Sequence, residues 1–158
     1  MILTNPDDWV DLYNAIKEES ANSEEQHVFI YASSSDADAV CALRILERLF
    51  KNDMISHGWL PVQRYTEIES DFAASYGGGE GAMRTAILIN CGAAEDVGEL
   101  LGLAQRPNVR VVVIDAHRPI AHRNNARSSA VALFLDETEG TPLASIPPGD
   151  DSDEEEEE

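Results

Sequence analysis

Five short hydrophobic runs alternate along the chain with segments whose apolar residues recur at helical spacing. The runs are rich in β-branched residues and are bounded by serine, glycine, asparagine or acidic residues, which is typical of buried strands. They cover residues 27–33, 59–63, 85–90, 109–115 and 130–136. Strands that alternate with helices predict an α/β fold, with a mostly parallel five-stranded sheet flanked by helices. The run at 130–136 is a candidate edge strand.

The helices are predicted from caps and apolar spacing. Asn5 or Thr4 can cap a first helix that begins at Pro6. Its apolar face follows the spacing i, i+3, i+4, i+7 and consists of Trp9, Leu12, Tyr13 and Ile16. Further helices are expected over 37–50 and near 94–105. Thr66 and Glu69 have the spacing of a capping box, which predicts a helix from there to about Tyr76.

Composition divides the chain into two parts. Residues 1–137 can form one α/β domain, whereas 138–158 are dominated by proline, glycine and acidic residues and are expected to be a disordered tail. The net charge is −19, from 30 acidic and 11 basic residues. The segment 150–158 is acidic at every position except Ser152, but the remainder is acidic as well. This charge disfavours sequence-independent binding to a nucleic-acid duplex.

Cysteine usage and hydropathy suggest the compartment. Cys41 and Cys91 are the only cysteines, and both stand in apolar contexts without metal-ligand spacing, so buried free thiols in a reducing compartment are expected. No stretch is apolar enough to span a membrane, and the first residues do not resemble a signal peptide. We therefore expect a cytosolic or nuclear protein that does not contact membranes.

Polar side chains follow three of the predicted strands. The carboxyl ends of parallel strands meet in one crevice, where ligands bind and where carboxylates hold divalent metals. An aspartate in place of Asn90 and a histidine in place of Ala116 would complete such a metal site, so the set looks incomplete. The candidate site residues are Asp36, Asp38, Asn90, Asp115 and His117.

Each of these residues also has a purely structural interpretation. Asp36 and Asp38 can cap the helix that follows them. His117 can form hydrogen bonds within the crevice without a metal, and Asn90 can be a structural hydrogen-bonding residue. A generic nucleotide-binding or response-regulator-like domain is a further alternative, although the glycine-rich segment 77–82 lacks the Lys-Ser/Thr ending of a phosphate-binding loop.

Basic residues gather in two places. Arg44, Arg48 and Lys51 form a stripe at i, i+4 and i+7 of the second helix. The segment 117–127 is the other place, and it contributes Arg118, Arg123 and Arg127. Either set can be a solvated face, or a contact for an acidic partner or single-stranded DNA.

Three motifs together resemble the DHH phosphoesterase superfamily, which includes the RecJ exonucleases. These are SSSDADAV (33–40), INCG (89–92) and DAHRP (115–119), each at the end of a predicted strand. The superfamily has a DxD motif, an aspartate that ends the middle strand, and an Asp-His-His motif. The resemblance is closest to its eukaryotic branch, the cell division control protein 45 family, in which the third motif reads Asp-x-His-Arg-Pro.

The resemblance implies the amino-terminal domain of a nuclear DNA replication initiation and elongation factor. Such a factor joins the Mcm helicase ring and the GINS complex as a non-catalytic scaffold of the replicative helicase. Asn90, Ala116 and Arg118 depart from the catalytic pattern, so no cofactor and no metal are expected. The alternative is a metal-dependent phosphoesterase or single-strand exonuclease in which Asp36, Asp38 and Asp115 hold an ion.

Overall fold

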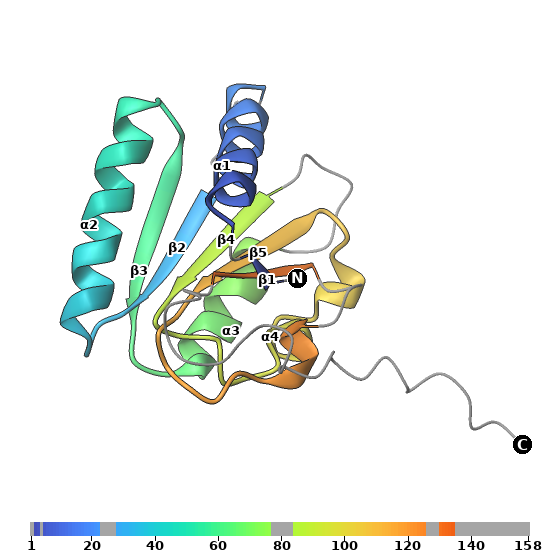
Figure 1. The fold of residues 1–158 in the computed structure, drawn as a ribbon. Helices are drawn as coiled ribbons and strands as arrows, with labels where there is room; N and C mark the ends of the chain where they lie inside the picture. The colour runs from blue at the N-terminus through green and yellow to red at the C-terminus, as the bar shows by residue number, and fades with distance from the viewer. Residues whose placement is uncertain (1, 4, 23–27, 77–83, 126–129, 135–158) are drawn as a thin grey trace, which may run out of the picture.

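The computed structural model describes residues 2–3, 5–22, 28–76, 84–125 and 130–134. Within them the chain forms an α/β fold around one parallel sheet, in the order β1-β6-β5-β4-β2-β3 (Figure 1). The strands are β1 (Ile2–Leu3), β2 (Val28–Ser33), β3 (His57–Val62), β4 (Arg84–Ile89), β5 (Val109–Ile114) and β6 (Val131–Phe134). The predicted α/β class and the five predicted strands are confirmed.

A sixth strand changes the edge of the sheet. The sequence pattern did not predict β1, because two residues are too few to show a period. β1 pairs in parallel with β6, and the Leu3 carbonyl accepts a hydrogen bond from Trp9 Nε1 at 3.2 Å. The assignment of 130–136 to a sheet edge was therefore wrong for the described part of that strand.

The first two helices follow their predicted signals. α1 (Pro6–Ala21) has Asn5 at its N-cap, where the side chain accepts a hydrogen bond from the Asp7 amide. α2 (Ala37–Asn52) has Asp36 at its N-cap, with the same contact from the Asp38 amide. The described residues also form α3, α4 and two 3₁₀ segments, η1 (Leu103–Gln105) and η2 (His122–Asn125).

The predicted capping box of the third helix is not present. α3 (Tyr65–Ser75) has Arg64 at its N-cap, which makes no side-chain capping bond. Glu67 acts instead, because its carboxylate accepts the Gln63 amide at 2.8 Å. A capping box has two hydrogen bonds, one to each side chain. Here only the bond between the glutamate in the first turn and the preceding backbone is made, and it requires no serine or threonine.

The helix expected near 94–105 is broken in two. α4 (Val97–Leu100) lasts one turn, and η1 follows it. Gly102 lies between them with φ +56°, a left-handed conformation that ends helices and that glycine adopts at little cost. A continuous helix was therefore the wrong prediction for this segment.

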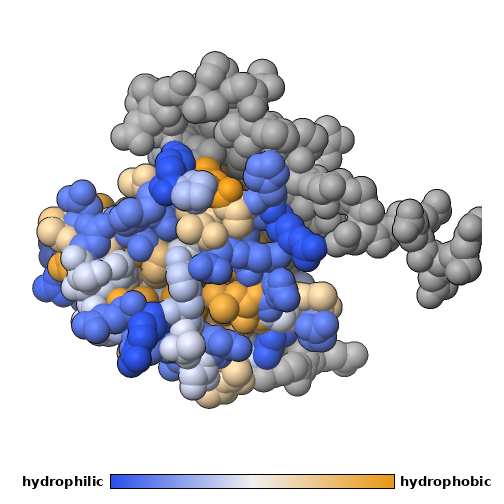
Figure 2. Space-filling model, turned by 90° about the horizontal axis from the view of Figure 1, so that it is seen from below, coloured by the Kyte–Doolittle hydropathy of each residue, from blue (hydrophilic) through white to orange (hydrophobic). Residues whose placement is uncertain are grey.

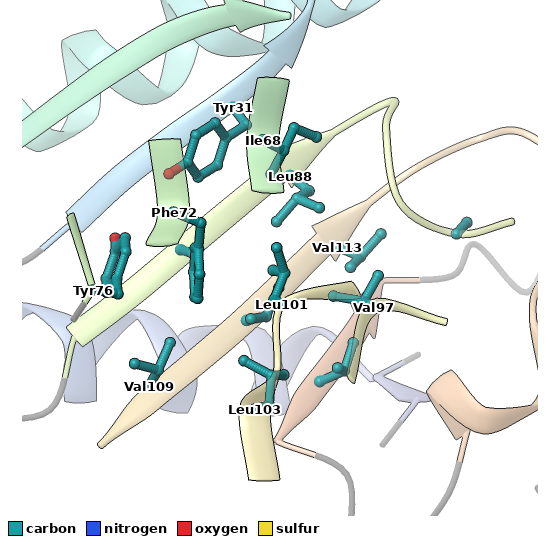
Figure 3. Packing of buried hydrophobic residues seen from close by; sticks show 14 of the residues in the cluster. Tyr31, Ile68, Phe72, Tyr76, Leu88, Val97, Leu101, Leu103, Val109 and Val113 are labelled. Carbon is teal, nitrogen blue, oxygen red and sulfur yellow. The ribbon is translucent and has the colours of Figure 1, made fainter. Parts of the chain in front are cut away.

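Hydrophobic residues from both faces of the sheet form two core layers. α1 and α2 cover one face, and α3 and α4 cover the other (Figure 1). Figure 3 shows the second layer, where Phe72 of α3 and Tyr76 at its C-cap pack over residues of β4 and β5. In both layers, buried residues of the strands pack against buried residues of the helices, so the sheet is fixed from two sides and its strand ends are held rigidly.

Some predictions fall outside the described residues. These are the expected tail at 138–158 and the glycine-rich segment 77–82. In the part of the chain that the structure describes, every helix is too short or too polar to cross a bilayer.

Candidate functional site

The candidate site lies where three neighbouring strands end. β5, β4 and β2 are adjacent in the sheet and parallel, so the residues that follow them meet at one edge. Asp36 comes after β2, Asn90 directly after β4, and Asp115 directly after β5. β2 and β3 run downward to this edge in Figure 1, and Figure 2 views the molecule from below. Hydrophilic residues dominate the described surface there, with hydrophobic residues exposed between them.

Asn90 links the three strand ends through hydrogen bonds. Its backbone amide donates to the Ile114 carbonyl at 2.8 Å, and its φ of +51° is a left-handed conformation that asparagine tolerates. Its Oδ1 accepts the Ala116 amide at 3.3 Å, and its Nδ2 donates to Asp36 Oδ2 at 2.7 Å. The Ala116 backbone amide can only donate, so the side-chain atom of Asn90 that faces it must be the oxygen. The NH₂ group of Asn90 therefore points at the Asp36 carboxylate.

Asp115 is buried, and both of its oxygens accept hydrogen bonds. Oδ1 lies 2.9 Å from the His117 backbone nitrogen and 2.8 Å from His117 Nδ1, and Oδ2 accepts the Ala93 amide at 3.0 Å. The His117 ring is exposed, and its Nε2 lies 3.9 Å from Asp36 Oδ2. His117 therefore lies between the two aspartates, closer to Asp115.

Asp36 and Asp38 have different surroundings. The sequence analysis grouped both as candidate site residues, but the structure places them differently. Asp36 is the N-cap of α2, whereas Asp38 is already in its first turn and is exposed. The backbone hydrogen bond from Asp38, followed by the side-chain bond from Asn90, lowers the pKa of the Asp36 carboxyl below its usual value.

Two residues that the sequence analysis did not single out hold the segment 92–97, beside the site, in place. Asn124 is buried, its Oδ1 accepts the Val97 amide at 3.0 Å, and its Nδ2 donates to the Glu95 carbonyl at 2.6 Å and to two further carbonyls. Gly92 has φ +147°, and a Cβ there would lie 2.8 Å from Leu88 Cδ2. The INCG motif contains the glycine, but nothing in the basic segment 117–127 distinguished Asn124.

The two cysteines differ from the expectation of buried thiols. Both are free, but Cys41 is exposed on α2, because it lies on the side of the helix opposite Leu43. Cys91 is partly buried beside the site, with Sγ 3.5 Å from the Tyr31 carbonyl. Burial raises the pKa of the Cys91 thiol to about 12, so it stays protonated at neutral pH.

The basic candidate residues differ in the contacts that their side chains make. Arg44, Arg48 and Lys51 are all exposed on α2. Arg44 and Lys51 also contact the buried Glu47 carboxylate, at 2.7 and 3.3 Å. The Arg118 side chain bonds the carbonyls of His117 and Asp115, at 3.0 and 3.4 Å. Two remain: Arg123, which lies 3.7 Å from Asp96, and Arg127, which falls outside the described residues.

The geometry limits what the site can hold. Among the described residues, no three histidine, cysteine, aspartate or glutamate side chains gather in a way that could hold a metal ion. The donors that contact Asp36 and Asp115 are backbone amides, an asparagine amide and a histidine ring. The fold and the site together define a parallel α/β domain with a hydrogen-bonded polar cluster at its strand ends.

Comparison with known proteins identifies the family. The sequence profile described as CDC45 matches residues 28–157. The chain is 34% identical over 130 residues to the cell division control protein 45 homolog of Schizosaccharomyces pombe, covering 82% of this chain and 19% of that protein. The homolog of Dictyostelium discoideum is 29% identical over 138 residues, covering 87% of this chain and 20% of that protein. The chain belongs to the CDC45 family, and it spans about a fifth of the length of these relatives.

A solved structure supports the same assignment. The crystal structure of CDC45 from Entamoeba histolytica superposes with a TM-score of 0.73 at 27% sequence identity. The match covers 86% of this chain and 25% of the other. The parallel α/β sheet is therefore the fold of this family in the matched region.

Proposed function

We propose that the chain serves as a non-catalytic DNA replication initiation and elongation factor in the nucleus. In this proposal it is part of a scaffold subunit of the eukaryotic replicative helicase, and its α/β surface holds the Mcm ring and the GINS complex together. Family membership and relatives named cell division control protein 45 support the replication role. The observation that carries the non-catalytic role is the hydrogen bond from Asn90 Nδ2 to Asp36 Oδ2.

The contact matters because two-metal hydrolysis needs carboxylates that share cations across the strand ends. Two such ions lie about 3.5–4 Å apart and are bridged and flanked by anionic ligands. Asn90 directs an NH₂ group toward Asp36, at 2.7 Å, where a shared cation would have to bind. An N–H donor at this oxygen occupies an acceptor site that a metal would use, and a neutral amide adds no negative charge to hold a second cation, so in our proposal the residues present do not fit a two-metal centre.

Asp115 supports the same conclusion. Its carboxylate is almost fully buried and accepts three hydrogen bonds, from the backbone nitrogens of Ala93 and His117 and from His117 Nδ1. Ala116 provides no ligand at the position where the catalytic pattern has a histidine. In our proposal, Asp115 organises the loop that follows β5, and the phosphoesterase alternative lacks an observation that favours it.

The basic segment after the site is the proposed contact for a partner or for single-stranded DNA. Arg118 and Arg123 are exposed, and Arg127 completes the segment in sequence. The acidic chain disfavours broad binding to DNA, so we propose a local contact that steers an acidic partner or one strand.

Co-purification tests the scaffold role. The chain is mixed with purified Mcm ring and GINS and is separated by size-exclusion chromatography. We expect it to elute with at least one of the two complexes, and charge reversal at Arg118 and Arg123 to weaken that retention. Reversal of Arg64, an exposed arginine at the N-cap of α3 that contacts Glu67, is the matched control. Elution of the chain alone would contradict the proposal.

A further inference from the structure

The solvent-facing side of α2 exposes an unusual number of large hydrophobic residues. Val40, Ile45 and Leu49 are 45%, 69% and 40% exposed. They make up half of the six large hydrophobics that are exposed in the described part of the chain, the others being Val10, Met54 and Trp59. Single exposed apolar residues are ordinary, but several on one helix indicate a surface that contacts something.

These residues form rows along the helix. Cys41, Ile45 and Leu49 are spaced i, i+4 and i+8, and all three are exposed. Residues four apart lie one above the other on a helix, so they make an apolar ridge. Arg44 and Arg48 form a parallel row beside it. The surface is therefore amphipathic, with an apolar ridge next to a basic one.

The charge of this helix is opposite to that of the chain. The net charge of the chain is −19, yet the exposed residues of α2 include Arg44, Arg48 and Lys51 and one acidic residue, Asp38. The other carboxylate of the helix, Glu47, is 6% exposed and contacts Arg44 and Lys51. Those contacts restrain the two cations, and Arg48 stays exposed between them.

We propose that this face of α2, defined by Cys41, Arg44, Ile45, Arg48 and Leu49, binds an acidic amphipathic helix of a partner protein. An apolar row on the partner packs against the Ile45 ridge, and its acidic residues face Arg44 and Arg48, which is the arrangement of helix-to-helix recognition. Single-stranded DNA complements the arginines but leaves Ile45 and Leu49 without an apolar counterpart at the phosphate backbone. The observations therefore favour a protein segment.

Fluorescence anisotropy with defined probes tests the proposal. The probes are an amphipathic helical peptide of about 20 residues with a leucine face and glutamates elsewhere, its twin with lysine for every glutamate, and an oligothymidine of similar length. We expect the acidic peptide to bind the full chain. We also expect both Ile45→Ser and the double variant Arg44→Glu/Arg48→Glu to weaken that binding at least about tenfold.

Matched controls separate the surface from general effects. Val10→Ser removes an apolar residue that is 56% exposed on α1, and Arg64→Glu reverses an exposed arginine elsewhere. Both controls should bind the acidic peptide as the wild type does, and thermal melting should show that every variant folds. The proposal is overturned if the acidic peptide does not bind, if its lysine twin binds equally well, or if Ile45→Ser leaves binding unchanged. A tighter complex with oligothymidine that depends on Arg44 and Arg48 would also overturn it.

Discussion

The side-chain amide of Asn90 donates a hydrogen bond to the Asp36 carboxylate at 2.7 Å, across the ends of two neighbouring strands. The bond joins the residue that directly follows β4 to the residue that caps α2. It places a neutral donor beside Asp36, where our proposal holds that a shared cation would need another anion. This contact is the structural basis for the non-catalytic proposal.

Asn90→Asp should destabilise the protein at neutral pH. The substitution replaces a donor with a second carboxylate beside Asp36, so a hydrogen bond is lost and two like charges face each other. We expect a loss of about 1–3 kcal/mol in the free energy of unfolding, measured by urea denaturation at pH 7. Millimolar Mn²⁺ should recover part of the loss, because a cation can bridge the new pair.

Asn52→Asp is the control for this experiment, since Asn52 is exposed at the last position of α2. It should change stability little and show no dependence on Mn²⁺. Wild-type stability in the Asn90→Asp variant without metal would mean that the Asn90–Asp36 contact does not organise the site.

The Asp36 carboxyl should contribute to acid sensitivity. Its pKa is lowered in the folded protein, so its stabilising effect is complete above the unfolded pKa of about 4 and is lost as the pH falls through the lower folded pKa. Asp36→Ala should therefore make stability less dependent on pH below about 4. Urea titrations at several pH values measure the slope, and equal slopes in both proteins would refute the assignment. The slope that remains should come in part from Asp53 and Glu67, whose pKa values are also lowered.

Asn124→Asp should be more damaging than its small change in volume suggests. The carboxylate can still accept the Val97 amide, but it meets the carbonyl oxygens of Gly92, Ala93 and Glu95 where an NH₂ group donated. We expect a loss of about 2–4 kcal/mol at pH 7, partly relieved in acid when the new group is protonated. Chemical denaturation at pH 7 and pH 4 tests this, and a variant as stable as wild type at pH 7 would contradict the role of Asn124.

Gly92→Ala should destabilise the loop after β4. The new methyl group would lie 2.8 Å from Leu88 Cδ2, which belongs to the buried core, at a φ of +147° that side chains rarely adopt. We expect a cost of about 1–3 kcal/mol. Gly98→Ala is the matched control, because Gly98 lies in α4 and a Cβ there would meet only Asp96 Oδ1 within 4 Å, at 3.3 Å. Equal melting temperatures for the two variants would contradict the packing argument.

The sequence was sufficient to predict the α/β class, because buried parallel strands are continuous apolar runs such as VVVI in β5. It failed for elements that depend on tertiary contacts. β1 is only two residues long and exists because β6 offers it a partner. The break after α4 depends on Gly102, and the first residue of α4, Val97, donates its amide to Asn124 from another segment.

The site residues were predictable as a group but not in their contacts. Asp36, Asn90 and Asp115 lie together because strand order brings β2, β4 and β5 side by side. The contacts of Asp36 and Asp38 depend on where α2 begins: Asp36 caps the helix and accepts a hydrogen bond from Asn90, whereas Asp38 lies away from this pair. The sequence could not show this, because an aspartate that caps a helix and one that binds a ligand look the same in sequence. The basic stripe was visible in the sequence, but the burial of Glu47 beneath it was not.

Hydrolysis of single-stranded DNA in the presence of Mn²⁺ tests the central claim most directly. The purified chain is incubated with a labelled oligonucleotide and Mn²⁺ or Mg²⁺, and mononucleotides are resolved by electrophoresis, with Asp36→Ala as the paired variant. The proposal predicts no release above the buffer control for either protein. Metal-dependent release of mononucleotides that Asp36→Ala abolishes would contradict it.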